Sequence, residues 1–352
     1  VRLGIEWQQN GVILPDTYLL DYDTILENAR SIKQAGDANG VQNFFMLKQI
    51  GRNPLIARAL TDMGYVGAVC VDFCEALTMV ENQIPLGNVG HLVQIPRAAL
   101  KKILRAKPVI VTVYTLEKAR EISAVCTELG LHQKLMLRVL GEGDMLYSGQ
   151  YGGFELQELD SAVRAIEAMP NVEVGGVCSF PCFLYDEAAQ DILPMPNLRT
   201  VQTAAEMLRA RGYRDLMLNT PSATCTHSIP MIAAAGGTHG EPGHGLTGTT
   251  PYHAGHPDAE ERPGYLYVSE VSHNLGDKAY CYGGGHYRRG HMKNALVGTT
   301  PENAKVVPVL PPDDSSIDYH FELQQNCPVS AAAVMAFRTQ FFVTRSRVAV
   351  VK

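Results

Sequence analysis

VQNFFMLK, residues 41–48, joins a short apolar run to a terminal lysine, and turn-forming residues follow it up to Pro54. Such a run, rich in aromatic residues and bounded by turn signals, is typical of a buried strand. A lysine at a strand end that is partly removed from water loses proton affinity, so its amine can act as a nucleophile or form a Schiff base. Most lysines near strand ends are only surface groups. The meaning of Lys48 therefore depends on the rest of the chain.

From Asp21 onward, β-prone runs alternate with helical periodicity, which is the pattern of βα units and a parallel sheet. The runs cover residues 44–47, 67–71, 90–94, 108–113, 134–139, 172–179, 215–219 and 238–241. Helical patterns between them cover residues 24–34, 54–63, 116–129, 156–168 and 198–211. Eight such units predict an α/β fold, a closed (β/α)8 TIM barrel. A doubly wound open sheet is the alternative, because the third and eighth runs are weak strands.

Side chains suited to a binding site recur at or just after these predicted strand ends. They are Lys48, Asp72, Gln94, Tyr114, Arg138, Phe180, Asn219 and Glu241. The C-terminal ends of barrel strands meet at one face, where TIM-barrel enzymes place their active sites. The series therefore favours the barrel and predicts an active site around Lys48.

Helical periodicity fades after about residue 251, and strand patterns replace it. They cover residues 265–271, 278–282, 305–310 and 343–350. The opening segment, residues 3–20, also has a strand-like pattern. We therefore expect a barrel over residues 21–250 and a C-terminal β-rich domain built from residues 1–20 and 251–352.

The composition of the 352 residues, 46% hydrophobic and 19% charged, is that of a globular enzyme. No apolar stretch of about 18 residues occurs, so we expect no membrane span. The net charge of −6 and the lack of a dense Lys/Arg run argue against a nucleic-acid partner. The cysteines have no zinc-site spacing and the start has no export-signal pattern, so we expect a cytoplasmic protein.

Two polar loops follow the seventh and eighth predicted strands, and the second of them is rich in glycine. Residues 219–224 offer the side chains of Asn219, Ser222 and Thr224, and residues 240–245 include Gly243 and His244. TIM barrels commonly hold phosphate groups in these two loops, where backbone N–H groups can approach an anion. Each loop alone is weak evidence, but together with Lys48 they fit a phosphorylated aldehyde.

This combination resembles the fold-type III pyridoxal 5'-phosphate (PLP) enzymes, which include alanine racemase and the ornithine and diaminopimelate decarboxylases. Residues 14–21 resemble the entry strand of that family, and residues 44–48 its lysine strand. The whole sequence is most similar to the YhfX-type group of alanine-racemase-like proteins. The resemblance implies a barrel that binds PLP, with Lys48 as its Schiff-base residue.

The resemblance also implies roles for other residues at the cofactor. The positions that match phosphate ligands in relatives are Arg52, Ser222, Gly243 and His244. Arg138 is a candidate for the phenolic oxygen of PLP or a substrate carboxylate, and Phe180 stands where relatives place a histidine against the ring. Glu241, in a decarboxylase-like Glu-Pro-Gly motif, falls opposite the pyridine nitrogen. A carboxylate there keeps the ring protonated, which makes it a strong electron acceptor.

Residues 280–287 resemble the Tyr-Gly-Asp-Gly-Tyr motif of the racemases, although Gly284 replaces the aspartate. In that family the first tyrosine acts from the partner subunit as the acid/base opposite the lysine, and Tyr282 is the matching position. The resemblance therefore implies a homodimer. Two bases on opposite faces of a planar carbanion are what stereoinversion requires.

We therefore expect a PLP-dependent amino-acid racemase or epimerase, an isomerase that uses Lys48 and Tyr282. PLP-dependent decarboxylation or lyase chemistry is the alternative, which Glu241 favours. A non-catalytic PLP carrier is an alternative of another class. His253 and His256 have possible ligand spacing, but a solvated loop is the preferred interpretation, and we expect no metal.

Overall fold

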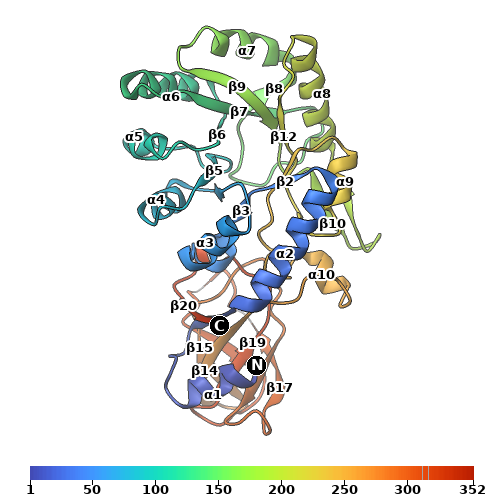
Figure 1. Ribbon diagram of the computed structural model, residues 1–352. Coiled ribbons are helices and arrows are strands. Elements are labelled where there is room, and N and C mark those ends of the chain that lie inside the picture. The colour runs from blue at the N-terminus through green and yellow to red at the C-terminus, as the bar shows by residue number, and fades with distance from the viewer. Residues whose placement is uncertain (311, 316) are drawn as a thin grey trace.

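The computed structural model describes residues 1–310, 312–315 and 317–352. Figure 1 shows a helix-ringed barrel above a β-rich domain, and both chain termini lie in the β-rich domain. The limits of the two domains, residues 21–250 for the barrel and residues 1–20 with 251–352 for the β-rich domain, remain predictions from the sequence.

The parallel sheet begins and ends on the segment that leads to Lys48. Its strand order is β2-β13-β12-β9-β7-β6-β5-β4-β3. The end strands β2 (Gln42–Asn43) and β3 (Phe45–Met46) are consecutive pieces of one segment, and they pair with β13 and β4 respectively. The sheet therefore curls round on itself into a TIM-like barrel, which confirms the predicted fold class.

The other barrel strands are β4 (Ala68–Cys70), β5 (Leu86–Val89), β6 (Ile110–Val113), β7 (Gln133–Leu140), β9 (Val172–Cys178), β12 (Met217–Asn219) and β13 (His239–Gly240). The covering helices are α2 (Tyr22–Asn39), α3 (Pro54–Asp62), α4 (Phe73–Glu81), α5 (Arg97–Arg105), α6 (Leu116–Leu129), α7 (Leu159–Glu167), α8 (Pro196–Ala210) and α9 (Ile229–Ala234). Smaller elements are β8 (Phe154–Glu155), the hairpin β10 (Phe183–Asp186) and β11 (Asp191–Pro194), α10 (Pro251–Gly255), and the 3-10 turns η1 (Lys48–Ile50), η2 (Leu156–Glu158) and η3 (Phe341–Val343).

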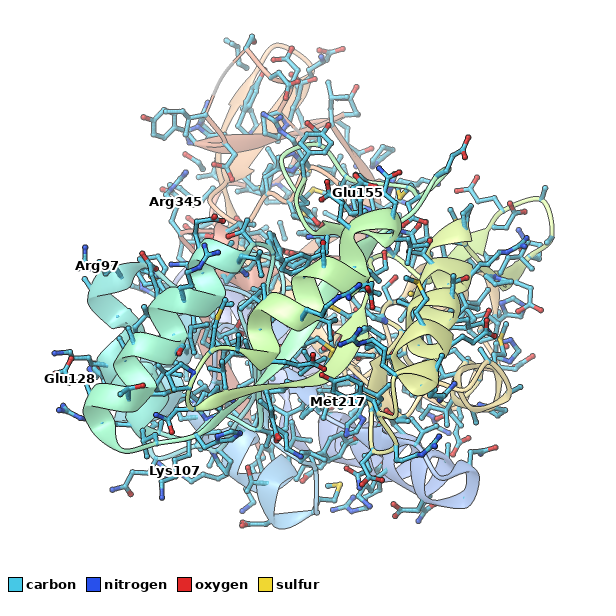
Figure 2. All side chains as sticks on the ribbon, turned by 90° about the horizontal axis from the view of Figure 1, so that it is seen from above. Arg97, Lys107, Glu128, Glu155, Met217 and Arg345 are labelled. Carbon is cyan, nitrogen blue, oxygen red and sulfur yellow. The ribbon has the colours of Figure 1, made fainter. Side chains whose placement is uncertain are left out.

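Local sequence signals set the ends of the longer helices. The carboxylate of Asp21 accepts a hydrogen bond from the backbone N–H of Thr24 at the start of α2, and the left-handed Gly40 ends that helix. Thr115 and Gly130 do the same for α6. Figure 2 shows charged side chains such as Arg97 of α5 directed outward, while the apolar faces of these helices pack on the sheet.

One strand prediction was wrong in position. The third barrel strand is β5 at Leu86–Val89, whereas the sequence pattern placed it at residues 90–94. Gly90, at φ +92°, turns the chain immediately after this strand, and a Cβ there would lie 2.7 Å from the carbonyl oxygen of Thr112. Consequently His91, not Gln94, occupies the C-terminal mouth of this strand.

The β-rich domain contains a sheet with the order β15-β18-β17-β16-β19-β14-β1-β20. Its strands are β1 (Thr17–Asp21), β14 (Tyr265–Leu275), β15 (Lys278–Tyr282), β16 (Asn294–Gly298), β17 (Lys305–Leu310), β18 (His320–Leu323), β19 (Ala332–Met335) and β20 (Arg347–Val351). β1 lies antiparallel to β14 and parallel to β20, so the start of the chain completes the C-terminal sheet.

The strand-like interpretation of residues 3–20 was only partly right. Residues Arg2–Gln9 form the helix α1, and only β1 is a strand. Ile5 on α1 packs with Leu19 of β1 and Val268 of β14 in a small apolar cluster. Helical spacing of Ile5 and Gln8 on one buried face explains the error, since alternation and helical periodicity are hard to separate over so few residues.

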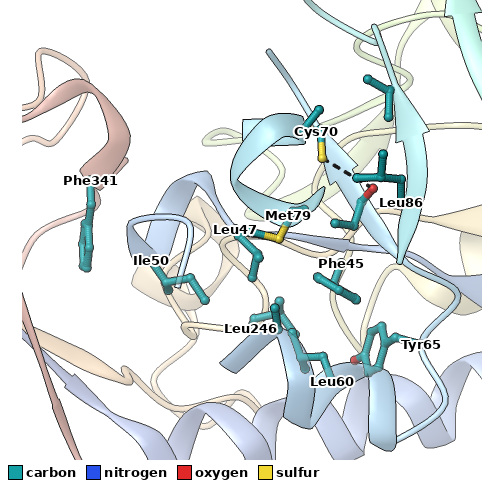
Figure 3. Packing of buried hydrophobic residues seen from close by; sticks show 14 of the residues in the cluster. Phe45, Leu47, Ile50, Leu60, Tyr65, Cys70, Met79, Leu86, Leu246 and Phe341 are labelled. Atoms are coloured by element: carbon teal, nitrogen blue, oxygen red, sulfur yellow. Dashed lines mark hydrogen bonds between the residues drawn. The ribbon is translucent and has the colours of Figure 1, made fainter. Parts of the chain in front are cut away.

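The two domains meet beneath the lysine turn. Figure 3 shows Leu47, Ile50 and Leu246 in the core of the barrel and Phe341 on the side of the β-rich domain. The turns η1 and η3 contact each other, and a Cβ on Gly51 would lie 3.0 Å from Val348 Cγ2. The C-terminal domain therefore stands directly beside Lys48. Within the described residues, no helix combines the length and hydropathy needed to cross a membrane.

Candidate active site

Lys48 is the first residue of η1, directly after the short strand β3. Hydrogen bonds from the N–H groups of Ile50 and Arg52 to the carbonyl oxygen of Leu47 close this turn. The lysine is buried, with 9% of its surface exposed, and among the described residues its amine has no hydrogen-bond or ion-pair partner. Burial lowers the pKa of Lys48, so the turn holds an amine that loses its proton far more readily than a solvated lysine.

The amine faces a cavity of about 510 Å³ that lies between the barrel mouth and the β-rich domain. Residues from the predicted site that line it are Lys48, Phe180, Ser222, Glu241, Gly243 and His244. The cavity therefore joins strand ends and loops that lie far apart in the sequence, as the barrel model predicted.

The loops after β12 and β13 form one wall of the cavity, and their N–H groups are free. Within the described chain we find no acceptor for the backbone N–H groups of residues 222–224 or 243–245. The loops approach closely, because a Cβ on Gly245 would collide with the carbonyl oxygen of Thr224. A cluster of unpaired N–H groups at the end of parallel strands is a binding site for an anion.

His244 adds a side chain to this cradle. Its Nδ1 lies 3.3 Å from the hydroxyl of Thr249, while its Nε2 is buried without a hydrogen-bond partner among the described residues. Burial lowers the pKa of His244 well below its usual value, so the ring is neutral and has one nitrogen available to donate. A Cβ on Gly243 would lie 2.6 Å from Nε2 of the buried Gln49, so a larger residue here would require the Gln49 amide to shift.

Glu241 lies at the floor of the cavity in a network of amides. Its Oε1 accepts hydrogen bonds from Nδ2 of Asn219 at 2.5 Å and from Nδ2 of Asn88 at 3.3 Å. Its Oε2 is buried and makes no hydrogen bond, and it lies 3.9 Å from Nε2 of His91. Burial raises the pKa of Glu241 to about 7. The carboxyl group therefore has one oxygen reserved for a partner that the protein itself does not supply.

His91 is a site residue that the sequence prediction missed. Its ring packs edge-on against Phe180 at 5.6 Å between centroids, and Phe180 also contacts the ring of Tyr147 at 5.6 Å. Burial lowers the pKa of His91 to about 3, so it is neutral at physiological pH. A strand boundary placed at Val89 would have revealed it, since His91 is the first functional side chain beyond that end.

Three predicted cofactor ligands do not line the cavity: Asn219, which donates to Glu241, and two arginines. The guanidinium of Arg52 pairs with the carboxylate of Asp72 at 2.9 Å and lies 5.5 Å from the ring of Phe342. Arg138 is fully buried and donates to the hydroxyl of Tyr114 at 2.7 Å and to the carbonyl oxygen of Gln150 at 2.8 Å. Their contacts with a cofactor or substrate stay predictions.

Tyr282 is likewise absent from the cavity of its own chain. It ends β15, is 38% exposed, and its ring packs at 5.9 Å from that of His320. Its carbonyl oxygen accepts a hydrogen bond from the hydroxyl of Ser269 at 2.6 Å, which fixes the backbone but leaves the phenol at the surface. The predicted action across a subunit interface is untested.

The β-rich domain contributes side chains to the site, and two of them, Arg289 and Arg338, lie outside the motif at residues 280–287. Tyr287, Arg289 and Arg338 line the cavity on the side facing Lys48. The guanidinium of Arg289 lies 4.8 Å from the ring of Tyr147, a contact between the two domains. The second domain is therefore part of the site and not only a support.

The residues present fit the PLP that this fold family implies. The free N–H cradle with His244 suits a phosphate, the unpaired Oε2 of Glu241 suits a pyridine nitrogen, and the unpaired amine of Lys48 suits an aldehyde. Among the described residues, no group of three or more His, Cys, Asp or Glu side chains is arranged to hold a metal ion. His253 instead contacts Glu261 at 3.0 Å.

Two protein-family models match the chain, the alanine racemase N-terminal domain over residues 20–251 and the YhfX-like C-terminal domain over residues 266–352. The uncharacterized protein YhfX of Escherichia coli (strain K12) is 45% identical over 347 residues, which are 98% of this chain and 89% of that protein.

Solved structures with the same fold include a diaminopimelate decarboxylase from M. jannaschi, with a TM-score of 0.71 and 14% identity over 99% of this chain and 89% of that one. An alanine racemase of Clostridium difficile 630 has a TM-score of 0.66 and 15% identity over 91% and 86% of the two chains. A D-threonine aldolase from Filomicrobium marinum has a TM-score of 0.65 and 17% identity over 92% and 86%. At these identities the likeness is one of fold.

Proposed function

The chain belongs to the alanine racemase N-terminal domain family of fold-type III PLP enzymes, and from this premise we propose that it is a PLP-dependent amino-acid racemase or epimerase. One observation carries the proposal: a desolvated, unpaired lysine amine shares a cavity with a buried carboxylate and a cradle of free N–H groups. When bound, PLP supplies an aldehyde for amine substrates and a ring that accepts the electrons released at the substrate Cα.

Residues of the chain itself bind the cofactor and transfer the Cα proton. With PLP bound, Glu241 would hold a proton at the pyridine nitrogen through Oε2, while Asn219 and Asn88 fix the carboxylate through Oε1. His244 and the loop N–H groups would hold the phosphate. The amine of Lys48, whose pKa is lowered by burial, takes or returns the Cα proton on one face of the substrate.

Tyr282 of the partner subunit is the proposed acid/base on the opposite face. Its exposed position on β15, outside the cavity of its own chain, suits a group that acts across a subunit interface. This part of the proposal requires a homodimer.

Cofactor attachment is tested first. Purified protein incubated with PLP should show a visible absorbance band, and borohydride reduction followed by peptide mass spectrometry should locate PLP on Lys48. Lys48→Ala should lose the modification. A wild-type protein that binds no PLP would remove the basis of the proposed function.

The two-base assignment has its own test in mixed dimers of Lys48→Ala and Tyr282→Phe. Each variant alone should be unable to racemise a single enantiomer, because racemisation needs both Lys48 and Tyr282. Mixing should restore roughly a quarter of the activity, because half of the molecules then carry one intact site each. As a control, mixtures of Lys48→Ala with wild-type-like Tyr151→Phe should behave as simple dilutions. No recovery would exclude Tyr282 as a residue acting from the partner subunit.

A decarboxylase or lyase is the second candidate, and Glu241 favours it. A carboxylate at the pyridine nitrogen makes the ring a strong electron acceptor, which bond cleavage at Cα exploits fully. Release of carbon dioxide, ammonia or an aldehyde from candidate amino acids separates these reactions from racemisation.

A further inference from the structure

Two guanidinium groups at the cavity wall have no acidic partner. Within the described residues, neither Arg289 nor Arg338 forms an ion pair, and both belong to the β-rich domain. Nε of Arg338 is buried without a hydrogen-bond partner. The neighbouring Arg288 differs, since it points to solvent and pairs with Asp314 at 3.1 Å.

The acidic groups of the cavity are already engaged. The carboxylate of Asp72 is paired with Arg52, and Glu241 lies at the floor, held by two asparagine amides. The positive charges of both arginines also contribute to the low pKa of His244, which places them within electrostatic reach of the phosphate cradle and of Lys48. The wall nearest the β-rich domain is therefore cationic and unneutralised.

A PLP-dependent site that acts on an amino acid needs to hold a phosphate and an α-carboxylate. The cradle provides uncharged donors for the phosphate, from the free N–H groups and from His244. One guanidinium satisfies an α-carboxylate by a bidentate contact. Arg138 also has no acidic partner, but its guanidinium donates to Tyr114 and Gln150 and it does not line the cavity. One guanidinium is then left over.

We propose that Arg289 and Arg338 form an anion subsite that selects an amino acid with a second acidic group, a carboxylate or a phosphate, in its side chain. The proposal rests on the proposed function, because it assumes that an amino acid enters the cavity. Arg289 is exposed and Arg338 is partly buried, with its Nε buried and unpaired, so a neutral side chain that gives them no acidic partner is bound less well.

The test uses the PLP-loaded protein and calorimetric binding of isosteric pairs. Aspartate against asparagine, and glutamate against glutamine, differ in charge but hardly in shape, and both enantiomers of each are measured. We expect the acidic member to bind about 10-fold to 100-fold more tightly, the range of a charge-assisted hydrogen bond. O-phosphoserine against serine separates a phosphate subsite from a carboxylate subsite. Equal affinities within all three pairs would overturn the proposal.

Variants then assign the effect to the two arginines. Arg289→Met and Arg338→Met should each lower affinity for the acidic ligand and reduce the ratio within the pair, while Arg288→Met, the matched control, should leave both unchanged. PLP affinity is measured on every variant. If Arg338→Met loses PLP instead of ligand selectivity, Arg338 is a phosphate ligand and the subsite is refuted. A wild-type protein that binds no PLP contradicts the proposed function itself, a result distinct from a PLP-loaded protein without acid preference.

Discussion

Replacing Glu241 by glutamine should stabilise the cofactor-free protein at alkaline pH. The carboxyl is buried, and its pKa of about 7 in the fold exceeds the 4.5 of an unperturbed glutamate. Between these values the folded state binds the proton that the unfolded state has released, so wild-type stability falls as the pH rises through this window. Near pH 8 the ionised group costs the fold about 3 kcal/mol, and near pH 5 about 1 kcal/mol.

Glutamine fits this position without new strain. Its side-chain oxygen can keep the hydrogen bonds from Asn219 and Asn88, and its amide occupies the place of the unpaired Oε2, facing the neutral His91. Urea unfolding of cofactor-free protein, followed by helix circular dichroism, should show a gain of up to about 3 kcal/mol near pH 8 that shrinks toward pH 5. The exposed Glu155→Gln is the control and should show no such gain.

The outcome bears on function as well as stability. The glutamine variant should lose catalytic activity, because a neutral amide cannot keep a pyridine nitrogen protonated. If Glu241→Gln raises the free energy of unfolding equally at both pH values, or lowers it near pH 8, the assignment of a buried carboxyl with a raised pKa to this position is refuted.

Three further predictions concern packing, the cradle and acid stability. Tyr18→Phe removes a buried hydroxyl that donates to the carbonyl oxygen of Gly285 at 2.6 Å, and should cost about 1–2 kcal/mol in the unfolding of the β-rich domain, read by the fluorescence of the single tryptophan. An unchanged midpoint would contradict this. Gly243→Ala should weaken PLP binding in an absorbance titration by pushing Gln49 into the cradle, and adding Gln49→Ala should restore it. If Gln49→Ala does not restore PLP binding, the effect of Gly243→Ala does not arise from its contact with Gln49. Burial lowers the pKa of His91 to about 3. The neutral ring therefore contributes to folding stability above pH 6.5, and this stability is lost as the pH falls from 6.5 toward 3. His91→Asn should lose less stability than wild type between pH 6 and 4, and parallel pH profiles would argue against a buried neutral histidine.

Most of the barrel could be predicted from the sequence because its strands and helices are determined by local sequence patterns. Most strand runs, the helices α2 and α6, and the lysine strand depend on neighbours in the chain, and they lie close to where the pattern predicted. The third strand was misplaced because residues 90–94 are as apolar as a short strand, and only the left-handed Gly90 shows that the chain has already turned. That shift of a few residues hid His91.

The two arginines that the second domain contributes to the site could not be predicted from the sequence. Arg289 and Arg338 reach the cavity because the β-rich sheet packs against η1, a long-range arrangement that leaves no periodic signal around either arginine. Arg52 and Arg138, which motif position alone placed at the cofactor, instead have partners within the protein. Motif position predicted the groups on the barrel strands and loops better than it predicted which arginines face the ligand.

The place of β1 between β14 and β20 has a consequence for synthesis on the ribosome. β1 precedes the barrel in the sequence and pairs at Thr17 with Val268 and with Arg347, so its partners are made only after the barrel. The barrel, whose strands lie between them in the sequence, can fold while this strand waits with open edges, a state in which strands are prone to wrong pairing. Completion of the second domain thus follows synthesis of the barrel and joins segments that flank it in the sequence. Deletion of β1 will therefore disturb a domain that is otherwise encoded after the barrel.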